Sequence, residues 1–110
     1  MNRYTICCTA EQTKKALELG APIQYASIND IRLERYVCID DECYTIPTTD
    51  QMIWWLRSKG IQFHFDDETN YWNIGDATND LTPLRRYGYS DNKELSAIDA
   101  ALEYLENNKQ

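Results

Sequence analysis

Residues 47–66 place the strongest constraint on what this chain can fold into, because they read as one capped helix followed at once by one alternating strand. Thr48 and Gln51 have the spacing of a capping box, in which each side chain satisfies a backbone N–H group at the start of a helix. Gly60 is the residue type that most often ends a helix in the left-handed conformation. The next six residues alternate apolar and polar side chains, which predicts a strand with one buried face.

Two further helices are predicted, one on each side of this segment. Thr9 and Gln12 form a second capping box, so we expect a helix over residues 9–20. Near the C-terminus, Ser90 or Asp91 can cap a helix that carries a stripe of apolar residues at helical spacing. The stripe consists of Leu95, Ile98, Leu102 and Leu105, and it could serve an internal core or a dimer equally well.

A β-hairpin is predicted in the first half of the chain. Residues 33–39 and 43–46 are rich in β-branched and aromatic side chains, and the three acidic residues between them suit a turn. Cys38 and Cys43 could face each other across this hairpin. A disulfide between them would form only in an oxidising compartment.

Further strands are expected before the hairpin and after the central strand. Residues 23–28 predict an extended segment that ends at a polar break formed by Asn29 and Asp30. The remaining strands are expected at residues 4–8, 71–75 and 84–89.

These elements together predict an α+β fold in one small domain, residues 1–110, with about three helices packed on a mainly antiparallel sheet. Parallels between the two halves of the chain suggest an internal strand–helix–strand repeat, over residues 1–43 and 44–107. Gly20 matches Gly60, for example, and each follows a capped helix. The alternative explanation is that any two capped helices that lead into strands look alike.

Composition limits the class of partner and the compartment. The net charge of −7 and the pI near 4.5 disfavour a large contact with nucleic acid. No apolar run approaches the roughly twenty residues that cross a bilayer, and the start of the chain lacks the pattern of a signal peptide. We therefore expect a cytoplasmic protein without a membrane partner, in which the four cysteines are free thiols.

Three stretches that span most of the chain carry a resemblance to a known group of proteins. They are TAEQ leading into LELGAPI, then IPTTDQMIWWLRSKGI, and finally the Ala-rich SAIDAALEYLENN. In these stretches the chain resembles a group of small uncharacterised proteins from gut Bacteroides-type bacteria and their prophages. The resemblance implies a bacterial or prophage origin and a shared architecture, and it carries over no catalytic residue.

Residues that could support catalysis or bind a metal are few. His64 is the only histidine, and no nucleophile or metal-binding motif accompanies it, so a surface histidine is favoured over a general base. The chain has four cysteines, which is the number of ligands in a structural zinc site. Two of them are adjacent on a predicted strand and point to opposite faces, so burial as small apolar residues is favoured over metal binding. The four cysteines are Cys7, Cys8, Cys38 and Cys43. The sequence therefore predicts no enzyme, no cofactor and no metal site.

Aromatic and arginine side chains supply the candidate contact surface. Trp54 lies about 100° around its helix from the core-facing Trp55, so it is either a contact residue or is covered by the N-terminal half. The other possible contacts are Arg85, Arg86, Tyr87 and Tyr89, because Tyr, Trp and Arg dominate interface hot spots.

The function predicted from these observations is that of a non-enzymatic accessory or interaction protein whose partner is another protein. One alternative is an acidic DNA mimic that inhibits a nucleic-acid enzyme. The other is a small nucleic-acid-binding module that uses Arg85, Arg86 and Tyr87.

Overall fold

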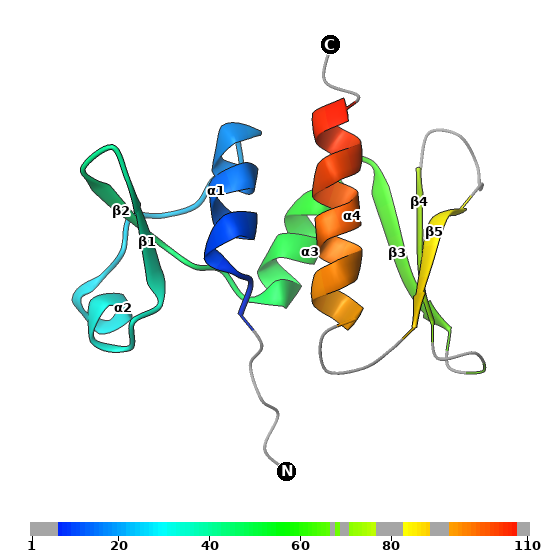
Figure 1. Cartoon of the computed structure of the whole chain (residues 1–110), viewed down its shortest axis with the longest axis horizontal. Helices are drawn as coiled ribbons and strands as arrows, with labels where there is room; N and C mark the ends of the chain where they lie inside the picture. Colours follow the sequence, from blue (N-terminus) through cyan, green and yellow to red (C-terminus); the bar gives the residue numbers. More distant parts are fainter. Residues whose placement is uncertain (1–6, 67, 69–70, 77–82, 89–92, 108–110) are drawn as a thin grey trace. The chain divides into compact units, whose positions relative to one another are not determined.

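The computed structural model describes residues 7–66, 68, 71–76, 83–88 and 93–107, and it divides the chain into two compact units, Met1–Thr49 and Asp50–Gln110. Each unit is considered by itself below. The described elements are labelled in Figure 1 and follow one another as α1 (Ala10–Glu18), α2 (Ile28–Arg32), β1 (Tyr36–Ile39), β2 (Glu42–Thr45), α3 (Thr49–Ser58), β3 (Ile61–Asp66), β4 (Tyr71–Asp76), β5 (Pro83–Gly88) and α4 (Lys93–Asn107).

The first unit contains the predicted hairpin. Strands β1 and β2 pair antiparallel, with Cys38 opposite Cys43, and α1 packs on β1. The two residues of the turn, Asp40 and Asp41, have φ values of 49° and 68°. Positive φ at both positions is the geometry of a type I′ turn, which matches the twist of the flanking strands. Asp tolerates this conformation better than most residues, so the acidic turn suits the hairpin.

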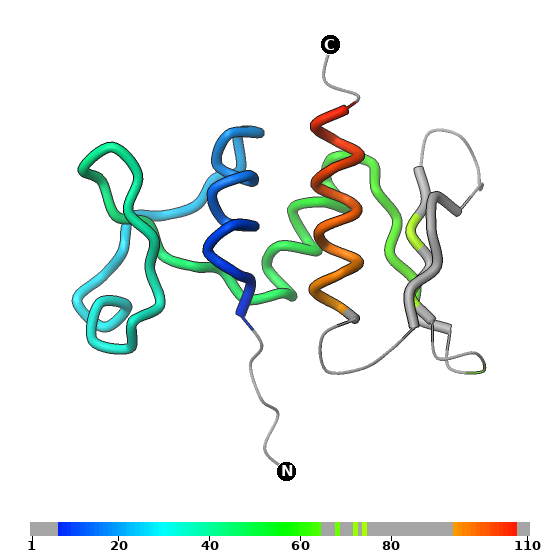
Figure 2. Tube along the Cα trace, viewed as in Figure 1, coloured from blue at the N-terminus to red at the C-terminus, as the bar shows by residue number. Residues whose placement is uncertain are grey.

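A short extended segment precedes α2 and runs alongside β2. The N–H of Thr45 donates to the carbonyl oxygen of Gln24 at 2.9 Å, and the N–H of Ala26 donates to that of Cys43 at 2.9 Å. Figure 2 follows this segment from α1 across the hairpin to α2. The predicted strand at residues 23–28 is therefore wrong in extent, because only Tyr25 forms a bridge, to Tyr44, and Ile28 already begins α2.

Helix α2 also overturns two neighbouring predictions. Asn29 and Asp30 were expected to break the chain, yet both lie inside the helix. The strand predicted from residue 33 begins only at Tyr36, because Leu33 and Glu34 form the end of α2. Of the strand predicted at residues 4–8, residues 4–6 lie outside the described part.

Among the described residues of that first predicted strand, pairing is limited to one bridge. Cys7 pairs with Thr48, and Cys8 does not continue the strand. The N–H of Cys8 donates to the carbonyl oxygen of Pro47 at 2.9 Å. Residues 7 and 8 therefore approach the chain just before α3 without forming a regular ladder.

Three helices end with the same backbone conformation, in which the second residue after the helix has positive φ. In α1 and α3 this residue is glycine, Gly20 with φ 92° and Gly60 with φ 94°. In α2 it is Glu34, with φ 56°. At the end of α2 the N–H of Glu34 donates to the carbonyl oxygen of Ile31. The N–H of Arg35 donates to the carbonyl oxygen of Asp30. This pair of bonds is a Schellman motif, whose left-handed residue is usually glycine.

Few large apolar side chains are buried among the described residues of the first unit. The buried apolar residues there are Cys8, Ala16, Ala21, Val37 and Pro47. The buried polar residues there are Gln12, Thr13, Asp30 and Thr49. Among these polar side chains, the Thr13 hydroxyl donates to the carbonyl oxygen of Thr9, and the Asp30 carboxylate accepts the N–H of Ser27.

The second unit is built on an antiparallel sheet with the order β3–β4–β5. The alternation of residues 61–66 predicts the first of these strands, and the other two were expected at residues 71–75 and 84–89. Figure 1 shows α3 and α4 on the same side of this sheet, and α4 packs on β4 and β5. On the sheet, Ile61, Phe63 and Ile74 are buried. The ring of Phe63 meets Trp72 edge to face, with ring centroids 6.3 Å apart.

The two helices of the second unit contribute its largest buried side chains. Four residues of α4 are fully buried and form one face, Ala97, Ile98, Ala101 and Leu102. Of the apolar stripe predicted for this helix, Ile98 and Leu102 therefore belong to an internal core, whereas Leu95 and Leu105 are half-buried. Helix α3 adds Met52, Ile53, Trp55 and Leu56.

The predicted fold class is confirmed, since helices pack with antiparallel strands in a small α+β arrangement. The three predicted helices are all present, and α2 is a fourth within the described residues. The internal repeat and the single domain stay predictions. No helix in the described ranges is both long and apolar enough to span a bilayer.

Candidate interaction surface

Exposed apolar side chains are concentrated in one short run of the first unit. In the described part of the chain, five of the six exposed large apolar residues lie between positions 25 and 36, and the sixth is Trp54. Three of the five are aliphatic residues in or next to α2: Ile28, Ile31 and Leu33, which are 73%, 50% and 69% exposed. We call these three the α2 patch. Ile28 and Ile31 are one helical turn apart and share a face of the helix.

The helix that carries this patch has only five residues, so its stability depends on the hydrogen bonds at its two ends. At its start, the N–H of Asp30 donates to the Ser27 hydroxyl at 3.1 Å, and the N–H of Ser27 donates to the Asp30 carboxylate at 2.9 Å. This reciprocal pair is a capping box. At its end, the Schellman motif around Glu34 satisfies the last carbonyl groups. Both ends together hold the exposed isoleucines in place.

Asp30 connects α2 to the hairpin. Its carboxylate is 3.4 Å from the Arg35 guanidinium, and its backbone carbonyl accepts the Arg35 N–H at 2.8 Å. The carbonyl of Arg35 in turn accepts the N–H of Ile46, just after β2, at 3.1 Å. The N–H of Ser27 lowers the pKa of Asp30, and the hydroxyls of Ser27 and Thr45 and the charge of Arg35 act in the same direction. Burial of the carboxyl opposes them and raises the pKa.

Tyr25 lies beside the other end of the hairpin. Its ring stacks on Tyr44 with centroids 5.1 Å apart, yet the residue stays 64% exposed. Its hydroxyl donates to the carboxylate of Glu42, and this hydrogen bond and the charge of Glu42 raise the pKa of Tyr25. Tyr25 therefore stays a neutral, exposed ring that is held in one orientation.

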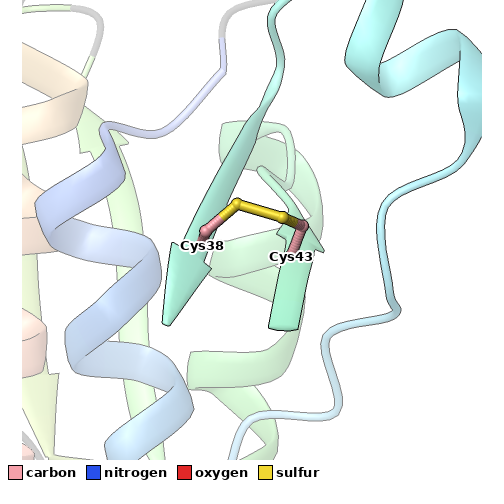
Figure 3. Close-up of a disulfide and its surroundings, with 2 residues drawn as sticks. All are labelled: Cys38 and Cys43. Atoms are coloured by element: carbon pink, nitrogen blue, oxygen red, sulfur yellow. A yellow bond between two sulfur atoms is a disulfide. The ribbon is translucent and has the colours of Figure 1, made fainter. Parts of the chain in front are cut away.

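A disulfide joins Cys38 of β1 to Cys43 of β2, as Figure 3 shows. The two residues are directly opposite in the hairpin, and their Cα atoms are 4.0 Å apart. Cys7 and Cys8 take no part in it, and Cys8 is buried, as predicted for a small apolar residue. The prediction of four free thiols is wrong for Cys38 and Cys43, because the hairpin brings their side chains together.

Replacing both Cys38 and Cys43 with serine is expected to lower the free energy of unfolding of the first unit by at most about 2 kcal/mol. The disulfide links residues only five positions apart, so it restricts the unfolded chain little. Amide hydrogen exchange in β1 and β2 at increasing urea concentration, with and without a dithiol reductant, measures the difference. Cys7→Ser is the control, and its response to reductant should equal that of the wild type. A much larger loss would show that the disulfide supports more than the hairpin.

The residues predicted for contact or catalysis are placed only in part. Trp54 is 73% exposed on α3, which is compatible with a contact role. Arg85, Arg86 and Tyr87 lie on β5, whose backbone alone is described, and Tyr89 lies outside the described residues. The contact role of these residues stays a prediction, as does the alternative that the N-terminal half covers Trp54.

His64 is exposed on β3, and its pairing partner across the sheet is Asn73. The residues that the structure describes contain no group of three or more His, Cys, Asp or Glu side chains arranged to hold a metal ion. The disulfide also removes two of the four thiolates that a zinc site built from cysteines would use.

Comparison with known proteins adds no homologue. No protein-family model, curated protein or solved structure matches the chain. The resemblance to proteins of Bacteroides-type bacteria and their prophages therefore stays a prediction.

The α2 patch was not predicted from the sequence, although two signals were present. Ser27 and Asp30 have the spacing of a capping box with an acidic third residue, and Ile28 and Ile31 are three residues apart. The pair of Asn29 and Asp30 suggested a break, because these residue types are poor helix formers away from the cap.

Proposed function

We propose that this chain is a non-enzymatic accessory or interaction protein that acts by binding another protein molecule. The observation that carries the proposal is the concentration of exposed apolar side chains between residues 25 and 36. Scattered single apolar residues are normal on a protein surface, but a group of this kind on a fixed backbone is typical of a contact site.

Two features support a protein partner over a lipid or nucleic-acid partner. The net charge of −7 opposes approach to anionic membranes and to phosphate backbones. The exposed side chains are aliphatic and aromatic, which suits the apolar centre of a protein interface. The exposed Trp54 supplies a second possible contact point on the other unit. The bacterial or prophage origin remains part of this proposal.

The cytoplasmic location also remains a prediction, and the disulfide argues against it. A reducing cytoplasm keeps most cysteine pairs as thiols, so the link between Cys38 and Cys43 favours an oxidising compartment.

Affinity purification of the tagged chain from a lysate of its own organism, with and without nuclease, tests the proposal. The wild type is compared with three variants: Ile28→Ser/Leu33→Ser, Trp54→Ala, and Arg85→Ala/Arg86→Ala. A protein that is recovered at constant stoichiometry, resists nuclease and is lost in the first variant is the expected result. Each variant is checked by circular dichroism, so that loss of binding is separated from loss of folding.

Other outcomes would replace the proposal, if variants at Asp40, Asp41, Glu42 and His64 and an activity assay are added to the comparison. Nuclease-sensitive recovery that is lost in the arginine variant would favour a nucleic-acid-binding module. Recovery of a nucleic-acid enzyme that depends on Asp40, Asp41 and Glu42 would favour a DNA mimic. Catalytic turnover that disappears in His64→Ala would contradict a non-enzymatic role.

A further inference from the structure

We propose that the partner that covers the α2 patch is a second copy of this chain, in a two-fold symmetric contact. This inference rests on the proposed function, because it names the partner of the same surface. It leaves the exposed Trp54 of the second unit available for a different protein.

The first unit gives a physical reason for self-association. In the described part of this unit Val37 is the one large aliphatic side chain that is buried, and the other large aliphatic side chains outside the α2 patch are half-buried. Ile28, Ile31 and Leu33 remain at least half exposed. Small folded units bury too little apolar surface to be stable alone and are often supported by disulfides or by oligomerisation. This unit already has a disulfide. Burial of the α2 patch against a second copy would add the apolar contact that its own fold lacks.

The charges around the patch are complementary to themselves. Arg32 and Glu34 lie on either side of Leu33 in the chain, both are exposed, and neither forms an ion pair with another described residue. In a two-fold symmetric contact, every contact between two different residues occurs twice. If Arg32 of one copy lies next to the partner's Glu34, then Glu34 of the first copy lies next to the partner's Arg32, and the interface contains two such ion pairs. A strongly basic or strongly acidic partner would instead meet one like charge at the edge of the patch.

The backbone at Glu34 supports a role for its side chain. At the equivalent position after α1 and after α3 the chain has Gly20 and Gly60, which adopt positive φ without strain. Glu34 adopts φ 56°, a left-handed conformation that is unfavourable for a residue with a side chain. Glycine would relieve this strain, so a carboxylate at this position suggests a use for the charge.

The distribution of charge also lowers the cost of bringing two acidic chains together. Residues 1–49 contain seven of the 18 acidic side chains and five of the 11 basic ones. The α2 patch thus belongs to the less charged unit, where repulsion between two copies is weaker.

The mass of the purified chain, measured by sedimentation equilibrium over a range of concentrations, tests the inference. We expect a reversible dimer for the wild type and a monomer for Ile31→Asp, whose side chain is half exposed in the folded unit. Glu34→Gly should weaken the dimer while the fold stays at least as stable to urea, which separates association from folding. Trp54→Ala is the control and should dimerise like the wild type.

A charge exchange provides the sharper test of the two-fold geometry. Arg32→Glu and Glu34→Arg should each raise the dissociation constant of the dimer roughly tenfold, because each replaces two attractions with two repulsions. The double variant Arg32→Glu/Glu34→Arg should restore the wild-type value. A double variant as weak as the single ones would overturn the symmetric contact.

A wild-type chain that remains a monomer at every concentration would overturn the inference as a whole. If the lysate experiment then recovered a different protein through the same patch, the proposed function would stand and this inference alone would fail. If neither a dimer nor a recovered partner were found, both would fail.

Discussion

Leu102→Ala is expected to lower the free energy of unfolding of the second unit by about 3 kcal/mol. Leu102 lies on α4, is fully buried, and belongs to the face of the helix that packs on β4 and β5. Its truncation removes apolar contact and leaves a cavity between helix and sheet that the surrounding side chains fill only in part.

Tryptophan fluorescence during urea unfolding measures this effect selectively. All three tryptophans, Trp54, Trp55 and Trp72, belong to the second unit, so their emission reports its unfolding. The matched control is Leu33→Ala, the same chemical change at a leucine that is 69% exposed, and it should leave the tryptophan transition unchanged. Equal losses in the two variants would contradict the assignment of Leu102 to an internal core.

Asp30→Ala is expected to destabilise the first unit more than Ser27→Ala, which should cost about 1 kcal/mol as the loss of one helix cap. The Asp30 carboxylate accepts hydrogen bonds from Ser27 and lies beside the Arg35 guanidinium. Its removal leaves Arg35 without the ion pair and α2 without the returning half of the capping box.

The same carboxylate makes the first unit sensitive to acid. The pKa of folded Asp30 is lowered, so the folded unit binds a proton less readily than the unfolded chain does. The stabilisation is therefore complete above the ordinary pKa of about 4 and is lost as the pH falls through the lowered folded value. Amide hydrogen exchange at Arg35 and Ile46, measured at several pH values, should show this loss in the wild type.

Asp30→Asn is the control for this acid response, because it keeps the shape of the side chain and removes the titration. In this variant, protection of the two amides should be lower near neutral pH and should change less between pH 5 and pH 2. Equal acid dependence in the variant and the wild type would assign the effect to other carboxylates.

The elements with strong periodicity were predictable, and the short, locally determined ones were not. The alternation that begins at Ile61 allows only one face to be buried, so it fixes both the type and the orientation of β3. Helix α2 has no such repeat, because five residues give little more than one turn. Its existence depends on the hydrogen bonds between Ser27 and Asp30 and on the turn at Glu34, which are local details in a sequence of neutral propensity.

The candidate surface was harder to predict than the fold for a related reason. From the sequence alone, Ile28, Ile31 and Leu33 would be assigned to the hydrophobic core, because aliphatic side chains are the ones most often buried. In the structure all three are exposed. Trp54, in contrast, was recognised as a possible contact because its neighbour Trp55 takes the buried face of α3. Exposure of one residue could thus be inferred from a helical angle, whereas exposure of the patch became visible only in the structure.

The small size of the buried apolar side chains in the described part of the first unit has a consequence for the response of this unit to temperature. Unfolding that exposes little apolar surface has a small change in heat capacity, so the stability of such a unit varies slowly on heating and cooling. The second unit buries Leu56, Ile98 and Leu102 and should have a more strongly curved stability profile. Cooling should therefore weaken the sheet-and-helix half of the chain before it affects the disulfide-linked hairpin.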